Sequence, residues 1–239
     1  MTVRSLRALL PLSLALALAG CAAGEFAGVS GGPPAAAPAV HLGDTWTYRG
    51  REGFRQPVEW TEIHEVTAVG PDGITVRVTY QDSTVVSGSR TEVLAAPGAV
   101  RTGALMDIET RRFDTPLARY QFPLVPGASW NQFVGNYNET AKRQGEINRY
   151  VRVGGWEKIA TPAGTFDAIR LRVLMRLDDD DFWREPTTTN YIVWYAPAVG
   201  ASVREERDAE YLEKGNRMDT AAVRAQHTLL ELVSFRPAS

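Results

Sequence analysis

The stretch TPAGTFDAIRLRVLMRL, from Thr161 to Leu177, has the two-residue period of a half-buried β-strand. From Ile169 onward, one series of alternate side chains is apolar and the other carries Arg170, Arg172 and Arg176. The Pro-Ala-Gly sequence before it is typical of a tight turn, since Pro fixes φ and Gly accepts positive φ. The stretch therefore predicts a strand that begins at a turn and buries one face.

The residues on either side predict an antiparallel meander. Residues 187–195 are rich in β-branched and aromatic side chains, and a second Pro-Gly turn follows at 196–200. Further strands are expected at 43–48, 58–69, 74–81, 84–94, 100–111, 129–140, 146–159, 202–212 and 219–235, with a single helical turn at 115–120. About ten antiparallel strands with few or no helices predict an all-β domain, either a large curled antiparallel sheet or an open β-barrel.

Three features occur twice in the same order. Gly43-Asp44-Thr45-Trp46 resembles the segment 127–130, the turn at Gly73 resembles that at Gly164, and the turn near Gly98 resembles that near Gly200. This order suggests two related halves of about four strands each. The alternative is that Gly, Pro and Trp recur by chance in a chain rich in hairpins.

The N-terminus has the pattern of a secretory signal. Two positive charges precede an apolar run at 8–19, which is too short to span a bilayer as a mature helix, and small residues lead to Cys21. Cys21 is the only cysteine of the chain, and its position resembles a bacterial lipobox. That resemblance implies cleavage before Cys21 and attachment of lipid to its thiol. The alternative is an ordinary signal peptide whose cysteine lies near the cut.

This reading predicts three parts of the chain. Residues 1–20 would be a lipoprotein signal peptide, residues 21–40 an acylated cysteine with a flexible Ala/Gly/Pro tether, and residues 41–239 a single β domain. The mature protein would be lipid-anchored in the bacterial cell envelope. By analogy with lipoprotein sorting, Ala22 after the cysteine favours the outer membrane, facing the periplasm.

Charge and motifs argue against several function classes. Without Arg4 and Arg7, 24 basic and 28 acidic residues leave a net charge of −4, so no nucleic-acid partner is expected. His64 lacks the second histidine of an H-E-x-x-H site, and no G-x-S-x-G motif occurs. We therefore expect no metal, no cofactor and no enzymatic activity. The acidic run 178–181 is interpreted as a solvated hairpin tip in preference to a calcium loop, whose spacing and Gly it lacks.

Aromatic residues crowd the hairpin that follows the opening strand. Trp183, Tyr191, Trp194 and Tyr195 lie close in sequence, with Tyr191 and Tyr195 on one face of the expected strand and Trp194 on the other. They indicate either a two-sided core or a groove for acyl chains or sugar rings. Arg170 and Arg172, on the face opposite Ile169, are either solvated or paired with a phosphate or carboxylate head group.

Several segments resemble a group of uncharacterised bacterial envelope lipoproteins. They are TPAGTFDA at 161–168, WYAPAVGA at 194–201, FPLVPGASW at 122–130 and Leu-Glu-Leu at 230–232. The resemblance implies a long curled antiparallel sheet, related in outline to the lipoprotein carriers LolA and LolB. No binding residue is carried over from it.

The leading hypothesis from the lipobox, the tether and the surplus aromatics is a membrane-anchored, non-enzymatic protein. It would bind an apolar or amphipathic envelope ligand or assist envelope assembly. Two alternatives stay open: a carbohydrate- or peptidoglycan-binding module, and an interaction scaffold for an envelope protein with no small ligand.

Overall fold

Twelve antiparallel strands make up the described part of the chain. The computed structural model describes residues 31–54, 56–82, 87–106, 109–179, 181–214 and 222–238. The strands are β1 (Thr45–Glu52), β2 (Val58–Gly70), β3 (Gly73–Gln81), β4 (Gly88–Ala96), β5 (Ala99–Gly103), β6 (Arg111–Ala118), β7 (Ser129–Asn138), β8 (Arg143–Thr161), β9 (Gly164–Asp178), β10 (Thr187–Ala196), β11 (Ala201–Leu212) and β12 (Ala222–Arg236). None of these described residues forms a helix long and apolar enough to cross a membrane.

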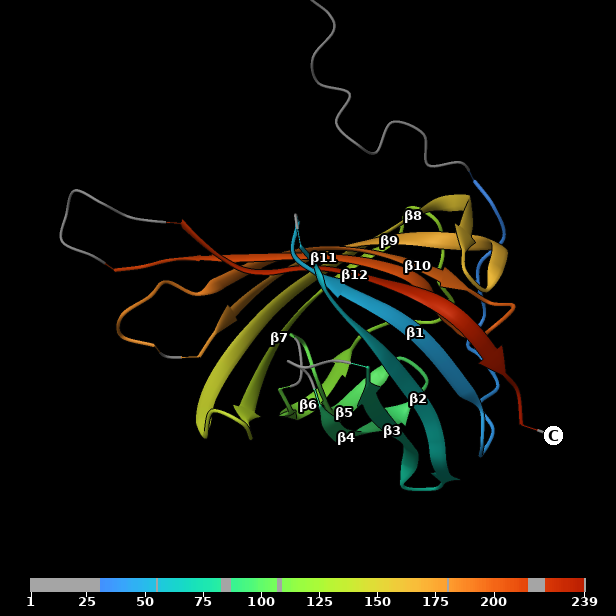
Figure 1. Cartoon of the computed structure of the whole chain (residues 1–239), viewed down its shortest axis with the longest axis horizontal. Helices are drawn as coiled ribbons and strands as arrows, with labels where there is room; N and C mark the ends of the chain where they lie inside the picture. The colour runs from blue at the N-terminus through green and yellow to red at the C-terminus, as the bar shows by residue number, and fades with distance from the viewer. Residues whose placement is uncertain are drawn as a thin grey trace, which may run out of the picture.

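Each strand pairs with its neighbour in sequence, and β1 pairs with β12, so the sheet closes into a barrel (Figure 1). The all-β prediction is confirmed: the structure has twelve strands where about ten were expected, and the barrel is closed. Closure pairs both edge strands, which would otherwise present unpaired backbone groups to other chains.

The segment between β5 and β7 differs from its prediction. Residues 100–111 were expected to form one strand, and 115–120 a helical turn; instead β5 ends at Gly103 and β6 covers Arg111–Ala118. Arg111, Phe113 and Leu117 are buried with exposed residues between them, which is the period of a strand. Pro116, within the expected helical turn, lies in the exposed part of β6.

Side chains replace the backbone ladder along part of the β6–β7 seam. The ladder joins residues 111–113 to 136–138. Farther along, the Gln132 side chain accepts a hydrogen bond from Ala118 N at 2.8 Å and donates one to Pro116 O at 2.9 Å. Pro116 has no N–H for a ladder bond, so the amide side chain satisfies backbone groups that the strands themselves do not pair.

The repeated features occupy equivalent places in two sets of six strands. Gly43 and Gly127 precede β1 and β7, Gly73 and Gly164 begin β3 and β9, and the turns containing Gly98 and Gly200 connect β4 to β5 and β10 to β11. All six glycines have positive φ, with the closest agreement between Gly43 (94°) and Gly127 (87°). The expected order of two halves is present, but each half has six strands instead of four.

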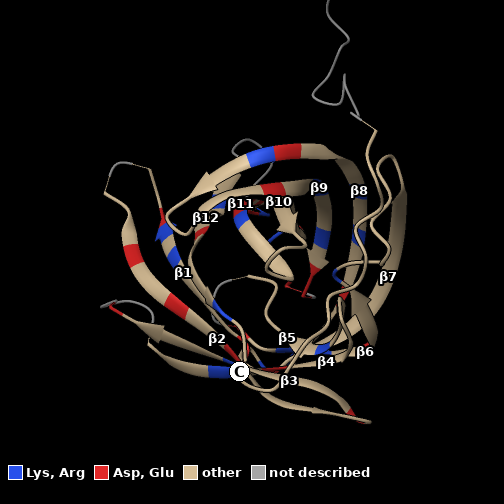
Figure 2. Ribbon diagram, turned by 90° about the vertical axis from the view of Figure 1, so that its right-hand side faces the viewer, with Lys and Arg blue, Asp and Glu red and all other residues tan. Residues whose placement is uncertain are grey.

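The distal half of the β8–β9 hairpin folds back over the outside of the barrel. In Figure 2, β8 passes outside the arc of β10, β11 and β12. Ile159, Ala163 and Phe166 from this hairpin pack against a buried cluster that includes Trp194 and Leu232. A second buried cluster, which includes Ile169 and Leu171, contains residues on the inner faces of β7 to β10. The strand that opened the sequence analysis therefore has apolar neighbours on both faces.

Part of the expected tether contacts the barrel. Ala35 is buried and exchanges backbone hydrogen bonds with Leu124 at 2.8 and 2.9 Å. Trp156 donates from Nε1 to Pro33 O at 3.0 Å. The residues just before His41 thus lie along the barrel wall, while the domain limits drawn from the sequence stay a prediction.

Candidate ligand cavity inside the barrel

A cavity of about 180 Å³ lies inside the barrel. Its lining runs from Pro38, Pro97 and Gly200, at the end of the barrel that carries the tight turns, to Leu105 in the connection between β5 and β6. The strand period places alternate residues inward, so each strand contributes every second side chain.

One wall of the cavity is apolar. It is formed by inward residues of the paired strands β9 and β10, among them Leu171, Val173, Met175 and Val193. These side chains are almost fully buried. A wall of this kind binds hydrocarbon because contact with it removes apolar surface from water.

The opposite wall carries a buried network of charges. Glu92 accepts hydrogen bonds from Arg90 at 3.0 Å and from Arg119 at 3.0 Å, and Arg90 also donates to Glu62 at 3.3 Å. His64 Nε2 lies 2.8 Å from Glu62 Oε1. Both carboxylates are at most 5% exposed, so they depend on these partners for stabilisation.

The partners keep the two carboxylates ionised. Burial alone would raise the pKa of Glu62, but the hydrogen bond from His64 and the charges of His64 and Arg90 outweigh it and lower the pKa to about 2. Burial also opposes ionisation of Glu92, yet Arg119 and Arg90 hold its pKa well below the usual range.

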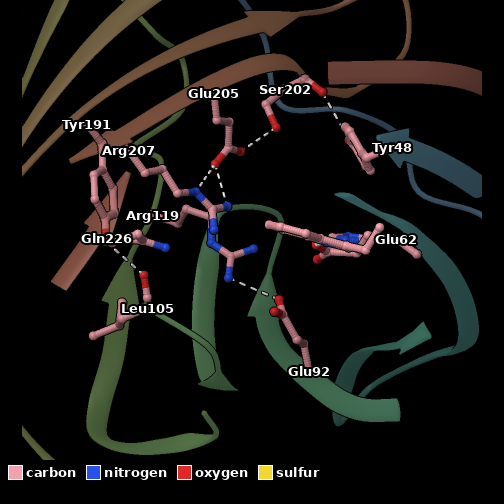
Figure 3. Close-up of polar contacts among 12 residues, drawn as sticks. Tyr48, Glu62, Glu92, Leu105, Arg119, Tyr191, Ser202, Glu205, Arg207 and Gln226 are labelled. Carbon is pink, nitrogen blue, oxygen red and sulfur yellow. Dashed lines mark hydrogen bonds and ion pairs between the residues drawn. The ribbon is translucent and has the colours of Figure 1, made fainter. Parts of the chain in front are cut away.

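β11 contributes a second ion pair, whose charges interact with Glu62 and Arg119 (Figure 3). Glu205 accepts hydrogen bonds from Arg207 Nε and Nη2 at 2.8 and 2.5 Å and from Ser202 Oγ at 2.5 Å. Tyr48 donates to Ser202 O at 2.9 Å. Burial opposes ionisation of Glu205, but Arg207 and Ser202 lower its pKa.

Tyrosines also line the cavity. Tyr191 contacts Gln226 at 2.9 Å and donates to Leu105 O at 3.1 Å (Figure 3). The Tyr195 ring lies 5.3 Å from the rings of both Tyr120 and Phe122. Burial raises the pKa of Tyr195, and its hydroxyl oxygen is buried without a hydrogen-bond partner among the described residues.

Arg149 enters the cavity from β8. It is 7% exposed and donates to two backbone carbonyls, Ala118 O at 2.7 Å and Arg119 O at 3.3 Å. Within the described ranges, no ion pair joins Arg149 to a carboxylate. Burial and the neighbouring Arg119 charge lower its pKa to about 10, so Arg149 is still a cation at neutral pH.

The structure separates the residues that the sequence grouped together. Tyr191 and Tyr195 line the cavity, whereas Trp194 lies outside it and donates from Nε1 to Glu157 of β8 at 2.8 Å. Trp183 is 40% exposed and packs edge-on against Tyr211 near the opposite end of the barrel. Cys21 lies outside the described residues.

Arg170 and Arg172 also lie away from the cavity, on the outer face of β9. Arg170 Nη1 is 3.9 Å from Glu157 Oε1, and Arg172 Nε donates to Asn190 Oδ1 at 3.2 Å. Their period-two alternation with Leu171 and Val173 places these arginines outward.

Sequence reasoning missed the charged cavity residues. Glu205 and Arg207 alternate with Arg204 and Glu206, so both faces of β11 carry charge and the pattern gives no inward direction. Arg149 lies within β8 with no charged residue at the two positions on either side, and Arg119 follows the end of β6, so neither belongs to a charge pattern. A usable signal was present in Arg-x-Glu at 90–92, because a pair of opposite charges two residues apart shares one face of a strand.

A smaller buried cluster surrounds Arg111 at the other end of the barrel. Arg111 is 1% exposed and donates to Glu109 at 2.7 Å, to Asn136 at 2.8 Å and to Asp179 at 2.6 Å. The prediction of a solvated acidic tip is therefore wrong for Asp179, which is buried because Arg111 and Arg184 neutralise it. Asp180 lies outside the described residues. In the part of the chain that the structure covers, no group of three or more His, Cys, Asp or Glu side chains is placed to hold a metal ion.

Comparison with known proteins identifies the fold alone. No protein-family model matches the chain, and no curated protein sequence matches it. A crystal structure of a Bacteroides fragilis protein, proposed to be exported and to have a YmcC-like fold, matches with a TM-score of 0.54 at 16% identity. It covers 84% of this chain and 99% of that protein. A Parabacteroides distasonis protein proposed to be a lipoprotein matches with a TM-score of 0.48 at 16% identity, over 85% of this chain and all of that protein. These matches do not confirm the resemblance in outline to LolA and LolB.

Proposed function

We propose that this protein is a lipid-anchored, non-enzymatic protein of the bacterial envelope that binds an amphipathic ligand inside its barrel. The observation that carries the proposal is the cavity of about 180 Å³ with one apolar wall and one charged wall. A hydrocarbon chain fits the first wall and a polar head group fits the second. The secretory leader, the position of Cys21 and the fold shared with a protein proposed to be exported support the envelope location.

The distribution of aromatic residues favours this function over a carbohydrate-binding module. A sugar-binding platform presents flat aromatic rings to solvent, but Tyr191, Trp194 and Tyr195 are each at most 8% exposed. The interaction scaffold would use an exposed apolar patch. It does not account for a charged cavity that the barrel encloses.

Native mass spectrometry tests ligand binding. The mature chain from residue 21, carrying Cys21→Ser so that its own acyl chains cannot occupy the cavity, is incubated with bacterial envelope extract and repurified without detergent. We expect a co-purifying amphiphile of fixed mass, which is lost when Val173→Trp fills the apolar wall. A protein of bare chain mass that also takes up no added amphiphile would contradict the proposal.

Lipid attachment is tested separately. In the full-length protein, Cys21→Ser is expected to abolish labelling by radioactive palmitate and to release the protein from membranes. Two or more acyl chains anchor a protein firmly, since each buried CH₂ contributes about 0.8 kcal/mol. Membrane attachment that persists in the Cys21→Ser variant would contradict the anchor.

A further inference from the structure

In the described part of the chain, four arginines and three carboxylates lie around the cavity, so one cation is in excess. Arg90 pairs with Glu62 and Glu92, Arg119 pairs with Glu92, and Arg207 pairs with Glu205. Arg149 is the arginine left with carbonyl partners alone. A buried cation without a counter-charge is unfavourable, and an anion beside it removes much of that penalty.

The surroundings of Arg149 suit an anion from the ligand. Two of its N–H groups hold the carbonyls of Ala118 and Arg119, which fixes the guanidinium and leaves three of its five N–H groups for a ligand. Arg119, whose side chain is 34% exposed and lines the same cavity, repels Arg149 and strengthens the demand for negative charge. The buried Tyr195 hydroxyl, which lines another part of the same cavity, lacks a partner among the described residues.

The apolar wall lies directly beside this cation. Arg149 pairs with Met175 across the β8–β9 ladder, and Met175 and Val173 are successive inward residues of β9. A head group bound at Arg149 would therefore have its hydrocarbon chain against β9. A neutral amphiphile would leave the Arg149 cation without a counter-charge, whereas an anionic one would pair with Arg149 and also pack its chain against β9.

We propose that the cavity selects amphiphiles with an anionic head group, a carboxylate or a phosphate, and that Arg149 is the residue that binds this group. This inference rests on the proposed function, because it names the class of ligand for the same cavity. A guanidinium presents paired donors to either anion, so the geometry is shared by both.

The test compares three probes of equal chain length: decanoate, decyl phosphate and decanol. Each is titrated by calorimetry into the mature chain with Cys21→Ser. We expect at least one anionic probe to bind about tenfold or more tightly than decanol, in the range that charge-assisted hydrogen bonds provide. The tighter of the two anionic probes distinguishes a carboxylate head from a phosphate head.

Matched variants assign the effect to Arg149. Arg149→Gln keeps an amide donor for the Ala118 carbonyl and removes the charge, so it should cancel the preference for anions while decanol binds as before. Arg149→Lys keeps the charge without the planar fork and should restore part of the preference. Arg172→Gln, on the outer face of β9, should leave all three affinities unchanged.

The outcomes separate this inference from the proposed function. If decanol and both anions bind equally and Arg149→Gln changes none of them, the anion site is overturned and the cavity proposal stands. If no probe binds the unmutated cavity, both are overturned. Since decanol binding reports an intact cavity, a variant that binds decanol normally has not failed by misfolding, and Arg149→Lys provides a second, less disruptive change.

Discussion

Arg111 shows how a single side chain holds one end of the barrel together. Its planar group donates to Glu109, Asn136 and Asp179, which lie on three separate segments. Burial opposes its charge, but Asp179 and Glu109 outweigh that effect and raise the pKa of Arg111. The same fork geometry on several acceptors is not available to a lysine.

Arg111→Ala is therefore expected to destabilise the barrel by about 3–5 kcal/mol, because it leaves buried carboxylates without their cation. Urea denaturation followed by circular dichroism measures the change. Arg112→Ala is the control. Arg112 follows Arg111 in sequence, but its side chain is 65% exposed and pairs with Glu139 at 3.2 Å, so its loss should cost less than about 1 kcal/mol. Equal effects of the two substitutions would contradict the role given to the buried cluster.

Glu62 predicts a pH dependence of stability. Its pKa is about 2 in the folded protein against a usual 4.5, so its stabilising contribution is complete above about pH 5 and is lost as pH falls toward 2. Glu62→Gln lacks this titration. The difference in free energy of unfolding between wild type and Glu62→Gln should narrow by about 2 kcal/mol from pH 6 to pH 3.

Urea midpoints at each pH measure this difference. Glu65→Gln serves as the control, since Glu65 is 48% exposed and 3.8 Å from its partner Arg77, and exposed pairs contribute little. A gap between wild type and Glu62→Gln that stays constant across this pH range would show that Glu62 titrates alike in both states.

At the scale of the element, the turns set where each strand begins. Gly73 and Gly164 start β3 and β9 with similar positive φ. Each lies at the turn between the second and third strands of its half. Their surroundings differ. A Cβ on Gly73 would lie 2.2 Å from Leu94 O, whereas a Cβ on Gly164 would meet nothing within 4 Å.

The two glycines therefore form a matched pair. Gly164→Ala should cost about 1–2 kcal/mol for the strained backbone alone. Gly73→Ala should cost clearly more, because the added methyl group also displaces the β4 backbone. Thermal unfolding of both variants checks the order; a Gly164→Ala variant that is equally or more destabilised would contradict the steric argument.

Most strands were predictable because their period of two is visible without knowledge of the fold. β9 is the clearest case, with apolar residues from Ile169 to Leu177 on one face. β6 was not, because it is short and contains Pro116, and its burial at Phe113 and Leu117 depends on strands distant in sequence. Trp194 was assigned to the correct face, but its cover by β8 depends on how a hairpin folds back after the barrel closes.

At the scale of the molecule, closure joins the two six-strand halves at β1–β12 and at β6–β7. The cavity wall takes residues from both halves, with Arg90 and Glu92 from the first and Arg149 and Glu205 from the second. Neither half buries its inner face alone. We therefore expect the barrel to unfold as one cooperative unit.

Tryptophan fluorescence tests this expectation. Trp46→Phe with Trp60→Phe leaves four tryptophans, all in the second half. Gly73→Ala, a change in the first half, is then added to this double-substitution variant. It should lower the unfolding midpoint by the same amount whether unfolding is followed by tryptophan fluorescence or by circular dichroism. A fluorescence midpoint that does not move would show that the halves unfold separately.

The sequence by itself determined the class of the fold, the order of the strands, the repeated turns and the expectation of a lipid anchor. These properties are local: they depend on alternation, on Pro and Gly at turns and on a contiguous leader. Closure, the cover over Trp194 and the charged cavity were decided by the tertiary structure alone. Arg149 lies near Arg119 and Tyr191 because segments distant in the chain meet inside one barrel, and no pattern along a single strand records which faces will meet. The strand at 161–177 defines the architecture, while the proposed ligand site depends on what the other strands bring to its inner face.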